Sequence, residues 1–361
     1  MMTNEAYKNT IIDLLKRTVE KQASDLHLIA GFSPAMRING KIKSTEYAPL
    51  TPDDVDGLVK SILTHEQIEK LNSELELDFS YALSGIARFR GNIMKQRGTL
   101  SAAFRAVPFT MPKFEQLGLP KEIQSLCELS RGLVLVTGPT GSGKSTTLAS
   151  LIDIINTNRA LNIVTIEDPI EFLHKHKKST VRQREIGMDT HSFSSALRHV
   201  LRHDPDVILI GEMRDLDSVS IALTAAETGH LVFSTLHTQT APLTISRIVD
   251  IFSDDRREQV RQQLAGSLKA VISQQLLPRA DGSGRVVAVE YMVDTPAVRN
   301  LIREGKEHQL YSTIQMGHSY GMQTMDSALV KLYQSGKITS DIALEYCIDA
   351  AEVKRMIRNW G

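Results

Sequence analysis

The sequence predicts an α/β protein in which a smaller α+β domain precedes a P-loop nucleotide-binding domain. Three patterns support this class: a glycine-rich loop between an apolar run and a helical stretch, further short apolar runs alternating with helical stretches, and period-two alternation before residue 108. The 361 residues correspond to about two domains. With 42% hydrophobic and 23% charged residues, the chain can bury a sizeable core.

Charge and cysteine content argue against several classes of function. Lys plus Arg and Asp plus Glu each number 42, so no global field favours nucleic acid or an anionic membrane. Cys127 and Cys347 lie too far apart for a zinc spacing and fit a reducing compartment. Because no apolar stretch approaches about 18 residues and the N-terminal residues include charges, we expect a chain that is neither inserted nor exported.

The first domain begins with a helix and short strands. Apolar residues between Ile11 and Val19 recur near a 3.6 period, which predicts an amphipathic opening helix. Residues 25–30 alternate like a strand. Residues 36–42 read as a hairpin around Asn39-Gly40, a dipeptide that suits a type I′ turn.

Two helices and an antiparallel meander follow. Thr51 with Pro52 is typical of a helix start, and residues 64–67 form a capping box for a second helix. From residue 77 to residue 107 the period returns to two, with turns at Ser84-Gly85 and Arg97-Gly98.

A proline-rich segment over residues 108–120 indicates the domain boundary, near residue 115. We assign residues 1–110 to the first domain, 111–120 to a linker and 121–361 to the second domain. Parallel strands are predicted there by apolar runs at 133–136, 163–166, 207–210 and 231–233. The residues from about 295 to 361 read as helices.

A phosphate-binding motif occupies residues 138–145, with the pattern G-x-x-x-x-G-K-[ST] between an apolar run and a helix. Its glycines let backbone N–H groups converge on phosphates, and the helix N-terminus adds positive potential. Lys144 reaches the outer phosphates and Ser145 ligates Mg²⁺, while Thr146 approaches the α-phosphate or packs in the first turn. The predicted nucleotide-binding residues are Gly138, Pro139, Thr140, Gly141, Ser142, Gly143, Lys144, Ser145 and Thr146.

Carboxylates follow the next two apolar runs. One run ends in Glu167 and Asp168 and, beyond a proline, Glu171, while the other is followed by Glu212. Carboxylates at the carboxyl ends of parallel strands are well placed for a nucleotide site. Each of the first three can also be a solvated loop acid or a helix cap. Spacing leaves open which carboxylate touches the metal, and we choose Glu212 at the tip of a Walker B-like strand.

Two histidines, His230 and His237, flank the last of these apolar runs, seven residues apart. This separation is too long for a chelating pair on a strand. They are either structural or sensors of the γ-phosphate.

Basic residues gather at two places. The cluster at residues 174–178, with Arg182 and Arg184 beyond it, is more typical of a solvated face or subunit contact than of a nucleic-acid site. Arg90, Arg97 and Arg105 lie in the meander, where they either face water or meet the phosphates of a neighbouring subunit as arginine fingers.

Together these motifs resemble the secretion and type IV pilus motor ATPases, and among them the PilT-type pilus retraction (twitching motility) ATPases. The resemblance covers nearly the whole chain. It rests on Ser24 to Leu28, the P-loop, the acidic box from Glu167 to Glu171, Gly211-Glu212, and the histidine box from Gly229 to His237.

The resemblance implies a PAS-like N-terminal domain, a RecA-like ATPase domain and a homo-hexameric ring that hydrolyses ATP with Mg²⁺. By position, Glu171 would be the general base and Glu212 the Walker B acid that holds Mg²⁺ with Ser145. His230 and His237 would sense the nucleotide state. Arg90, Arg97 and Arg105 fall where the family supplies arginines in trans.

Retraction rather than assembly is indicated by a segment that looks like the family motif AIRNLIRE. Its residues are Ala297, Val298, Arg299, Asn300, Leu301, Ile302, Arg303 and Glu304, with Val298 in place of Ile. The assembly and type II secretion branches typically carry a four-cysteine metal insertion, which two distant cysteines cannot build. Residues 321–326 and 332–339 also look like the accessory paralogue, PilU.

We therefore expect an ATP-driven motor that acts on an inner-membrane pilus platform protein from the cytoplasmic side, together with a paralogous retraction ATPase. The alternatives are a PilU-like accessory ATPase, a RecA-like DNA-dependent motor, and a nucleotide-gated scaffold without turnover. The balanced charge argues against a nucleic-acid partner.

Overall fold

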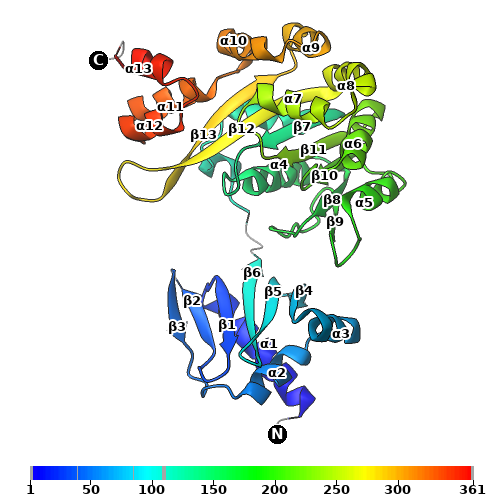
Figure 1. Cartoon of the computed structure of the whole chain (residues 1–361), viewed down its shortest axis with the longest axis vertical. Coiled ribbons are helices and arrows are strands. Elements are labelled where there is room, and N and C mark those ends of the chain that lie inside the picture. Colours follow the sequence, from blue (N-terminus) through cyan, green and yellow to red (C-terminus); the bar gives the residue numbers. More distant parts are fainter. Residues whose placement is uncertain (1–2, 39, 84, 108–110, 359–361) are drawn as a thin grey trace. The chain divides into compact units, whose positions relative to one another are not determined.

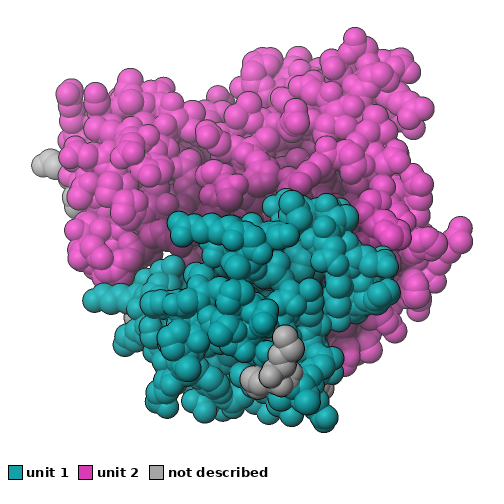
Figure 2. All heavy atoms as spheres, turned by 60° about the horizontal axis from the view of Figure 1, so that its bottom comes forward, with its two compact units in different colours: residues 1–110, 171–173 teal, residues 111–170, 174–361 magenta. Residues whose placement is uncertain are grey.

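The computed structural model describes residues 3–38, 40–83, 85–107 and 111–358. Its contacts divide the chain into two compact units, drawn in separate colours in Figure 2. Unit 1 contains residues 1–110 and 171–173, and unit 2 contains residues 111–170 and 174–361. Each unit has its own hydrophobic core.

Unit 1 is a six-stranded antiparallel sheet with three helices, and its strand order is β3-β2-β1-β6-β5-β4 (Figure 1). The elements are α1 (Asn4–Glu20), β1 (Asp25–Ile29), β2 (Ala35–Ile38), β3 (Lys41–Ser44), α2 (Pro52–Lys60), α3 (His65–Glu74), β4 (Glu76–Leu83), β5 (Ala87–Gln96) and β6 (Thr99–Val107). The predicted opening helix, strands and meander are thus present. Residues 39 and 84, on which two predicted turns depend, lie outside the described residues.

Local capping sets the helix starts of unit 1. The Thr51 and Thr64 side chains each accept a backbone N–H three residues ahead, and Asp54 and Gln67 close the two capping boxes in return. In the core, Phe79 packs edge-to-face on Phe104 with ring centroids 6.0 Å apart. These side chains close one face of the sheet against α1 and α2.

Unit 2 is built on a seven-stranded sheet of order β13-β12-β7-β11-β10-β8-β9. Its strands are β7 (Gly132–Thr137), β8 (Asn162–Glu167), β9 (Thr180–Glu185), β10 (Val207–Ile210), β11 (Leu231–Leu236), β12 (Leu268–Pro278) and β13 (Arg285–Val293). All neighbouring strands run parallel except the pair β12 and β13. The four predicted parallel strands are therefore confirmed.

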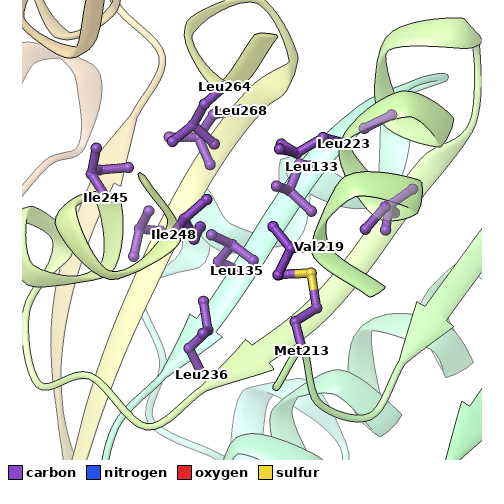
Figure 3. Packing of buried hydrophobic residues seen from close by; sticks show 14 of the residues in the cluster. Leu133, Leu135, Met213, Val219, Leu223, Leu236, Ile245, Ile248, Leu264 and Leu268 are labelled. Carbon is purple, nitrogen blue, oxygen red and sulfur yellow. The ribbon is translucent and has the colours of Figure 1, made fainter. Parts of the chain in front are cut away.

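Helices cover both faces of this sheet, so alternate residues of one strand enter different cores. Leu133 and Leu135 contribute to a cluster with α5 to α10, of which Figure 3 shows a part. Val134 and Val136 join a second cluster with α4. The helices are α4 (Lys144–Asn158), α5 (Phe193–Val200), α6 (Leu216–Thr228), α7 (Ala241–Asp250), α8 (Asp254–Ser267), α9 (Pro296–Arg303) and α10 (Leu310–Met316).

The C-terminal helices are α11 (Met325–Gln334), α12 (Ser340–Tyr346) and α13 (Ala350–Arg358), and they share a small core with β12 and β13 (Figure 1). Among the residues that the structure describes, no helix combines the length and apolar character needed to cross a membrane.

Two features of unit 2 differ from the sequence expectation. Within the predicted linker 111–120, Phe114 and Leu119 are buried in the core beside α4. Residues 108–110 of the proline-rich segment lie outside the described residues. The hairpin of β12 and β13 was not predicted, although it extends the sheet beyond β7.

Candidate nucleotide-binding site

The site of unit 2 lies at the carboxyl ends of its parallel strands. The P-loop follows Thr137 of β7, His237 follows Leu236 of β11, and these two strands pair with Leu236 opposite Thr137. Glu167 ends β8, beside the end of β10 that leads to Gly211 and Glu212. Ligands bind at this edge of open α/β sheets because the loops that follow the strands converge there.

The P-loop has the backbone shape that its glycines predict. Gly138, Gly141 and Gly143 have φ values of +136°, +80° and +93°, which side-chain-bearing residues rarely adopt. A Cβ on Gly138 would lie 2.2 Å from the carbonyl oxygen of Gln274 on β12, so only glycine fits. The buried Ser142 Oγ has no hydrogen-bond partner within the described part of the chain. A loop of this backbone shape that leads into a helix N-terminus fits a phosphate chain.

Lys144, the first residue of α4, folds back over the P-loop. Its Nζ donates to the carbonyl oxygens of Gly138 and Pro139 at 2.8 Å and 3.0 Å. The same nitrogen lies 3.5 Å from His237 Nδ1. The ammonium group is therefore held at the loop mouth, next to the predicted sensor histidine. Ser145 and Thr146 follow in the first turn of α4.

Glu212 lies at the centre of a charged network. Its Oε2 accepts from Arg214 Nη2 at 2.7 Å, and its Oε1 lies 3.1 Å from His237 Nε2. Burial raises the pKa of Glu212, but the hydrogen bond from Arg214 and the nearby His237 outweigh burial, so the pKa lies below its ordinary value. The carboxylate is thus kept ionised at the edge where the P-loop lies.

The acidic box is divided between two places. Glu167 Oε1 accepts from Thr165 Oγ1 at 2.6 Å and from Gln183 Nε2 at 3.1 Å, which fixes this carboxylate at the end of β8. Glu171 groups with unit 1, where its Oε1 lies 3.8 Å from Arg90 Nη2. The assignment of Glu171 as general base stays a prediction.

His230 does not join this site. It precedes β11, and its carbonyl oxygen accepts from the backbone N–H of Gly132 at the start of β7. The six residues of β11 separate it from His237, and they span about 20 Å at 3.3 Å per residue. His230 Nδ1 lies 3.0 Å from the carbonyl oxygen of Ala225, at the end of α6. The assignment of His230 as a sensor of the nucleotide state stays a prediction.

The other predicted arginines lie in unit 1. Arg105 Nε donates to Asp25 Oδ1 at 2.9 Å, and Arg37 Nε lies 3.8 Å from Asp25 Oδ2. Arg97 occupies the turn between β5 and β6, where φ is +48° and the side chain is exposed. Action of these arginines on another subunit stays a prediction.

The AIRNLIRE-like segment forms α9 and the residue after it. Val298 and Ile302 are fully buried, whereas Ala297, Asn300, Arg303 and Glu304 are exposed. Asn300 Nδ2 donates to Glu304 Oε1 at 2.8 Å, which closes the exposed side of the last turn. The segment therefore combines an apolar anchor with a polar surface.

Sequence reasoning missed two neighbours of the site. Arg214 pairs with Glu212, and its only sequence signal is a basic residue two positions after an acid. Gln274 of β12 donates from Nε2 to Thr147 Oγ1 at 2.9 Å, which ties β12 to α4. No local pattern identifies Gln274, because its partner is 127 residues away.

Known proteins are similar to this chain in sequence and in fold. A family model described as type II/IV secretion system protein matches residues 102–312. The type IV pilus retraction ATPase PilT of Pseudomonas aeruginosa is 49% identical over 93% of this chain and 97% of its own length. The type IV pilus ATPase PilU of the same organism is 40% identical over 96% of this chain and 90% of its length.

A solved structure gives the same result for the fold. The crystal structure of the pilus retraction motor PilT with bound ADP superposes with a TM-score of 0.88 at 52% identity, covering 96% of this chain and 99% of that one. The predicted fold class, a RecA-like P-loop domain behind a smaller α+β domain, and the resemblance to PilT-type ATPases are thereby confirmed. The chain belongs to the type II/IV secretion system protein family.

Proposed function

We propose that this chain hydrolyses ATP to power the retraction of type IV pili and that it works as a homo-hexameric ring. The observation that carries the proposal is the phosphate cradle of residues 138–145, with Lys144 and Glu212 beside it, in a chain 49% identical to a pilus retraction ATPase. The identity to PilU is lower, at 40%, which favours retraction by a PilT-type motor over a PilU-like accessory function.

The residues present fit ATP with Mg²⁺. The glycine-rich backbone of the P-loop and the buried Ser142 hydroxyl would bind the phosphates, and Lys144 would supply positive charge for the outer ones. Within the described residues no group of three or more His, Cys, Asp or Glu side chains could hold a metal alone. Mg²⁺ typically uses few protein ligands and keeps its waters and phosphates. Ser145 and Glu212 would hold the ion, which neutralises phosphate charge when bound.

The protein groups divide the work around that substrate. The P-loop and Lys144 orient the phosphates, and Glu171 takes a proton from the attacking water. His237, between Lys144 and Glu212, registers whether the outer phosphate is present. Arg90, Arg97 and Arg105 would stabilise phosphate charge on a neighbouring subunit. The ring would act from the cytoplasmic side on an inner-membrane pilus platform protein. A paralogous retraction ATPase would be a second partner.

The first test measures the ATPase rate per subunit against protein concentration, with mass determined in parallel. We expect the specific rate to rise as a hexamer forms. Arg97→Ala and Arg105→Ala should lower that rate without preventing nucleotide binding, whereas Lys95→Ala, on an exposed position of β5, serves as the control. A monomer that hydrolyses ATP equally well would contradict the intersubunit mechanism.

A second test addresses the general base. Glu171→Gln should retain ATP binding and abolish turnover, because an amide cannot act as a general base at neutral pH. Glu167→Gln is the matched variant at the other end of the acidic box. Turnover that survives in Glu171→Gln and disappears in Glu167→Gln would move the role of base to Glu167.

A further inference from the structure

A fully buried carboxylate, Glu290 of β13, connects the starts of two helices of unit 2. Its Oε1 accepts the backbone N–H of Ala241 at 2.7 Å, and its Oε2 accepts the backbone N–H of Met325 at 3.3 Å. These residues open α7 and α11. The Glu290 side chain has no solvent exposure. A carboxylate is favourable beside two helix N-termini, which both carry partial positive charge.

Capping alone does not explain this acid. Thr240 already caps α7 by accepting from the backbone N–H of Leu243, and Thr324 caps α11 by accepting from Ser327. Serine, threonine or asparagine satisfies a helix start without burying a charge. What Glu290 adds is a single rigid group bonded to both helices, whose starts lie far apart in the sequence.

The first of these helices, α7, is hydrogen-bonded to the loop that carries His237. Thr238, next to His237, shares a 2.7 Å hydrogen bond with the hydroxyl of Thr244 in α7. The same Thr244 hydroxyl donates to the carbonyl oxygen of Thr240 at 2.7 Å. The loop that carries His237 is therefore tied to the first turn of α7, the turn whose first N–H Glu290 holds.

The sheet supplies a second path from the P-loop to the same residue. Thr137, the last residue before the P-loop, donates to Ser273 Oγ of β12 at 2.9 Å. Ser273 in turn lies opposite Glu290 in the β12–β13 register. Thr137, Ser273 and Glu290 are all fully buried. The β12 residue that is hydrogen-bonded to Thr137 is thus the cross-strand partner of Glu290.

On its other side Glu290 reaches the C-terminal helices. Met325 is followed by Asp326, a second buried acid, which accepts the backbone N–H groups of Ile348 and Asp349 at 2.7 Å and 2.9 Å. Asp326 thereby fixes the start of the last helix to α11. It makes no hydrogen bond to α7 that the structure gives, so it offers a matched comparison with Glu290.

We propose that Glu290 is a positioning residue for ATP hydrolysis, which links the His237 loop through α7 to α11 and passes nucleotide-dependent shifts of that loop to the C-terminal helices. The inference rests on the proposed ATPase function. The physical basis is that one buried group bonded to two helix starts cannot follow one helix without moving the other or breaking a bond.

The test compares Glu290→Gln with Asp326→Asn. Either amide turns one buried acceptor into a donor that faces an N–H group, so both variants lose stability. We expect Glu290→Gln to lower kcat at least about tenfold, with KM within about twofold, because the phosphate contacts of the P-loop are untouched. Asp326→Asn should keep kcat within about twofold.

Hydrogen exchange supplies a readout that a purely structural role would not change. Upon addition of a non-hydrolysable ATP analogue with Mg²⁺, exchange of residues 325–334 should change in the unaltered chain and in Asp326→Asn, but not in Glu290→Gln. If Glu290→Gln does not fold, Thr244→Val breaks the link between the His237 loop and α7 at a buried isosteric position and should give the same two effects.

Two results would overturn the inference. One is equal kcat losses in Glu290→Gln and Asp326→Asn, and the other is a nucleotide-dependent change in α11 that persists in Glu290→Gln. If the unaltered chain turns over no ATP, the proposed function fails by itself. The exchange measurement still decides the inference in that case, because nucleotide binding rather than turnover drives it.

Discussion

In unit 2 the central strands are buried on both faces, whereas in unit 1 they alternate between buried and exposed positions. Every residue of β7, β10 and β11 is buried. In β4 and β5, by contrast, charged and polar residues alternate with core residues. The first pattern is expected of parallel strands covered by helices and the second of an antiparallel sheet with one covered face.

This difference determines where each unit can place chemistry. A strand buried on both faces offers reactive side chains only beyond its end, which is where Lys144, Glu212 and His237 lie. A half-exposed sheet offers them along its strands, as with Asp25 and Arg105. In unit 2, substitutions in the core should therefore change stability, and substitutions beyond the strand ends should change activity. In unit 1, the effect of a surface charge can be measured separately from that of core packing.

The largest expected effects come from the two separate cores. Phe233→Ala in unit 2 and Phe104→Ala in unit 1 remove fully buried rings and should each lower the free energy of unfolding by about 3–5 kcal/mol. Hydrogen exchange should show the loss of protection mainly in the unit that carries the change. Equal loss over both units would contradict two independent cores.

Loss of the P-loop ammonium should reduce activity with little effect on stability. Lys144→Ala should lower kcat/KM by about 10²–10³-fold, since one preorganised charge at the phosphates is removed. Lys177→Ala is the control, because its Nζ binds Asp153 on the same helix α4 at 2.7 Å but lies outside the P-loop. Steady-state ATPase kinetics and urea unfolding of both variants test this, and similar kinetic losses would contradict the assignment.

The free energy of unfolding should also depend on pH because of Glu290. Burial raises the pKa of Glu290 from its ordinary value of 4.5 to about 7, and the negative charge of Asp326 adds to this effect. The hydrogen bonds from the N–H groups of Ala241 and Met325 lower the pKa but do not outweigh burial. Between these values the folded chain holds a proton that the unfolded chain releases. The stabilisation from this proton is complete below pH 4.5 and is lost as the pH rises through about 7.

A comparison with Glu290→Gln isolates the contribution of this proton to stability, because glutamine does not titrate. The unfolding free energy of the unaltered chain, minus that of the variant, should fall by about 3 kcal/mol between pH 4.5 and pH 8. Urea unfolding at several pH values measures it. A difference that stays constant across this range would show that Glu290 titrates normally.

The smallest effect is expected on the exposed face of unit 1. Arg105→Ala should lower stability by about 1 kcal/mol or less, because the arginine side chain is 68% exposed. Burial raises the pKa of Asp25, but the bonds from Ser24 and Arg105 lower it further, so the pKa should rise when Arg105 is removed. An NMR titration of Asp25 measures this shift, with Arg37→Ala, at the longer contact, as control. A larger loss of stability would assign Arg105 a structural role.

Local patterns were sufficient to predict most elements of both units. The helix starts at Thr51 and Thr64 depend on side chains three residues away, so a short window of sequence contains both partners. The parallel strands are continuous apolar runs, and the P-loop motif fixes its own backbone shape through Gly138 and its neighbours. These features follow from interactions within a few residues.

Features that depend on distant partners were not predicted. The prolines of residues 108–120 indicated a linker but not the burial of Phe114 and Leu119, which pack into a core that only the folded unit provides. The β12–β13 hairpin extends the sheet beside β7, a strand that begins more than a hundred residues earlier. His230 belongs to the histidine box of the family, but it lies at the start of β11, whereas His237 lies at the carboxyl end of that strand.

The sequence by itself determined the fold class, the strands and capped helices, and a phosphate-binding loop with a lysine and a nearby acid. Each of these depends on residue type and short spacing. Only the tertiary structure decided that Arg214 and His237 share Glu212, and that Glu290 joins the starts of α7 and α11. These contacts form because parallel strand order and helix packing bring together groups that no periodicity in the sequence relates.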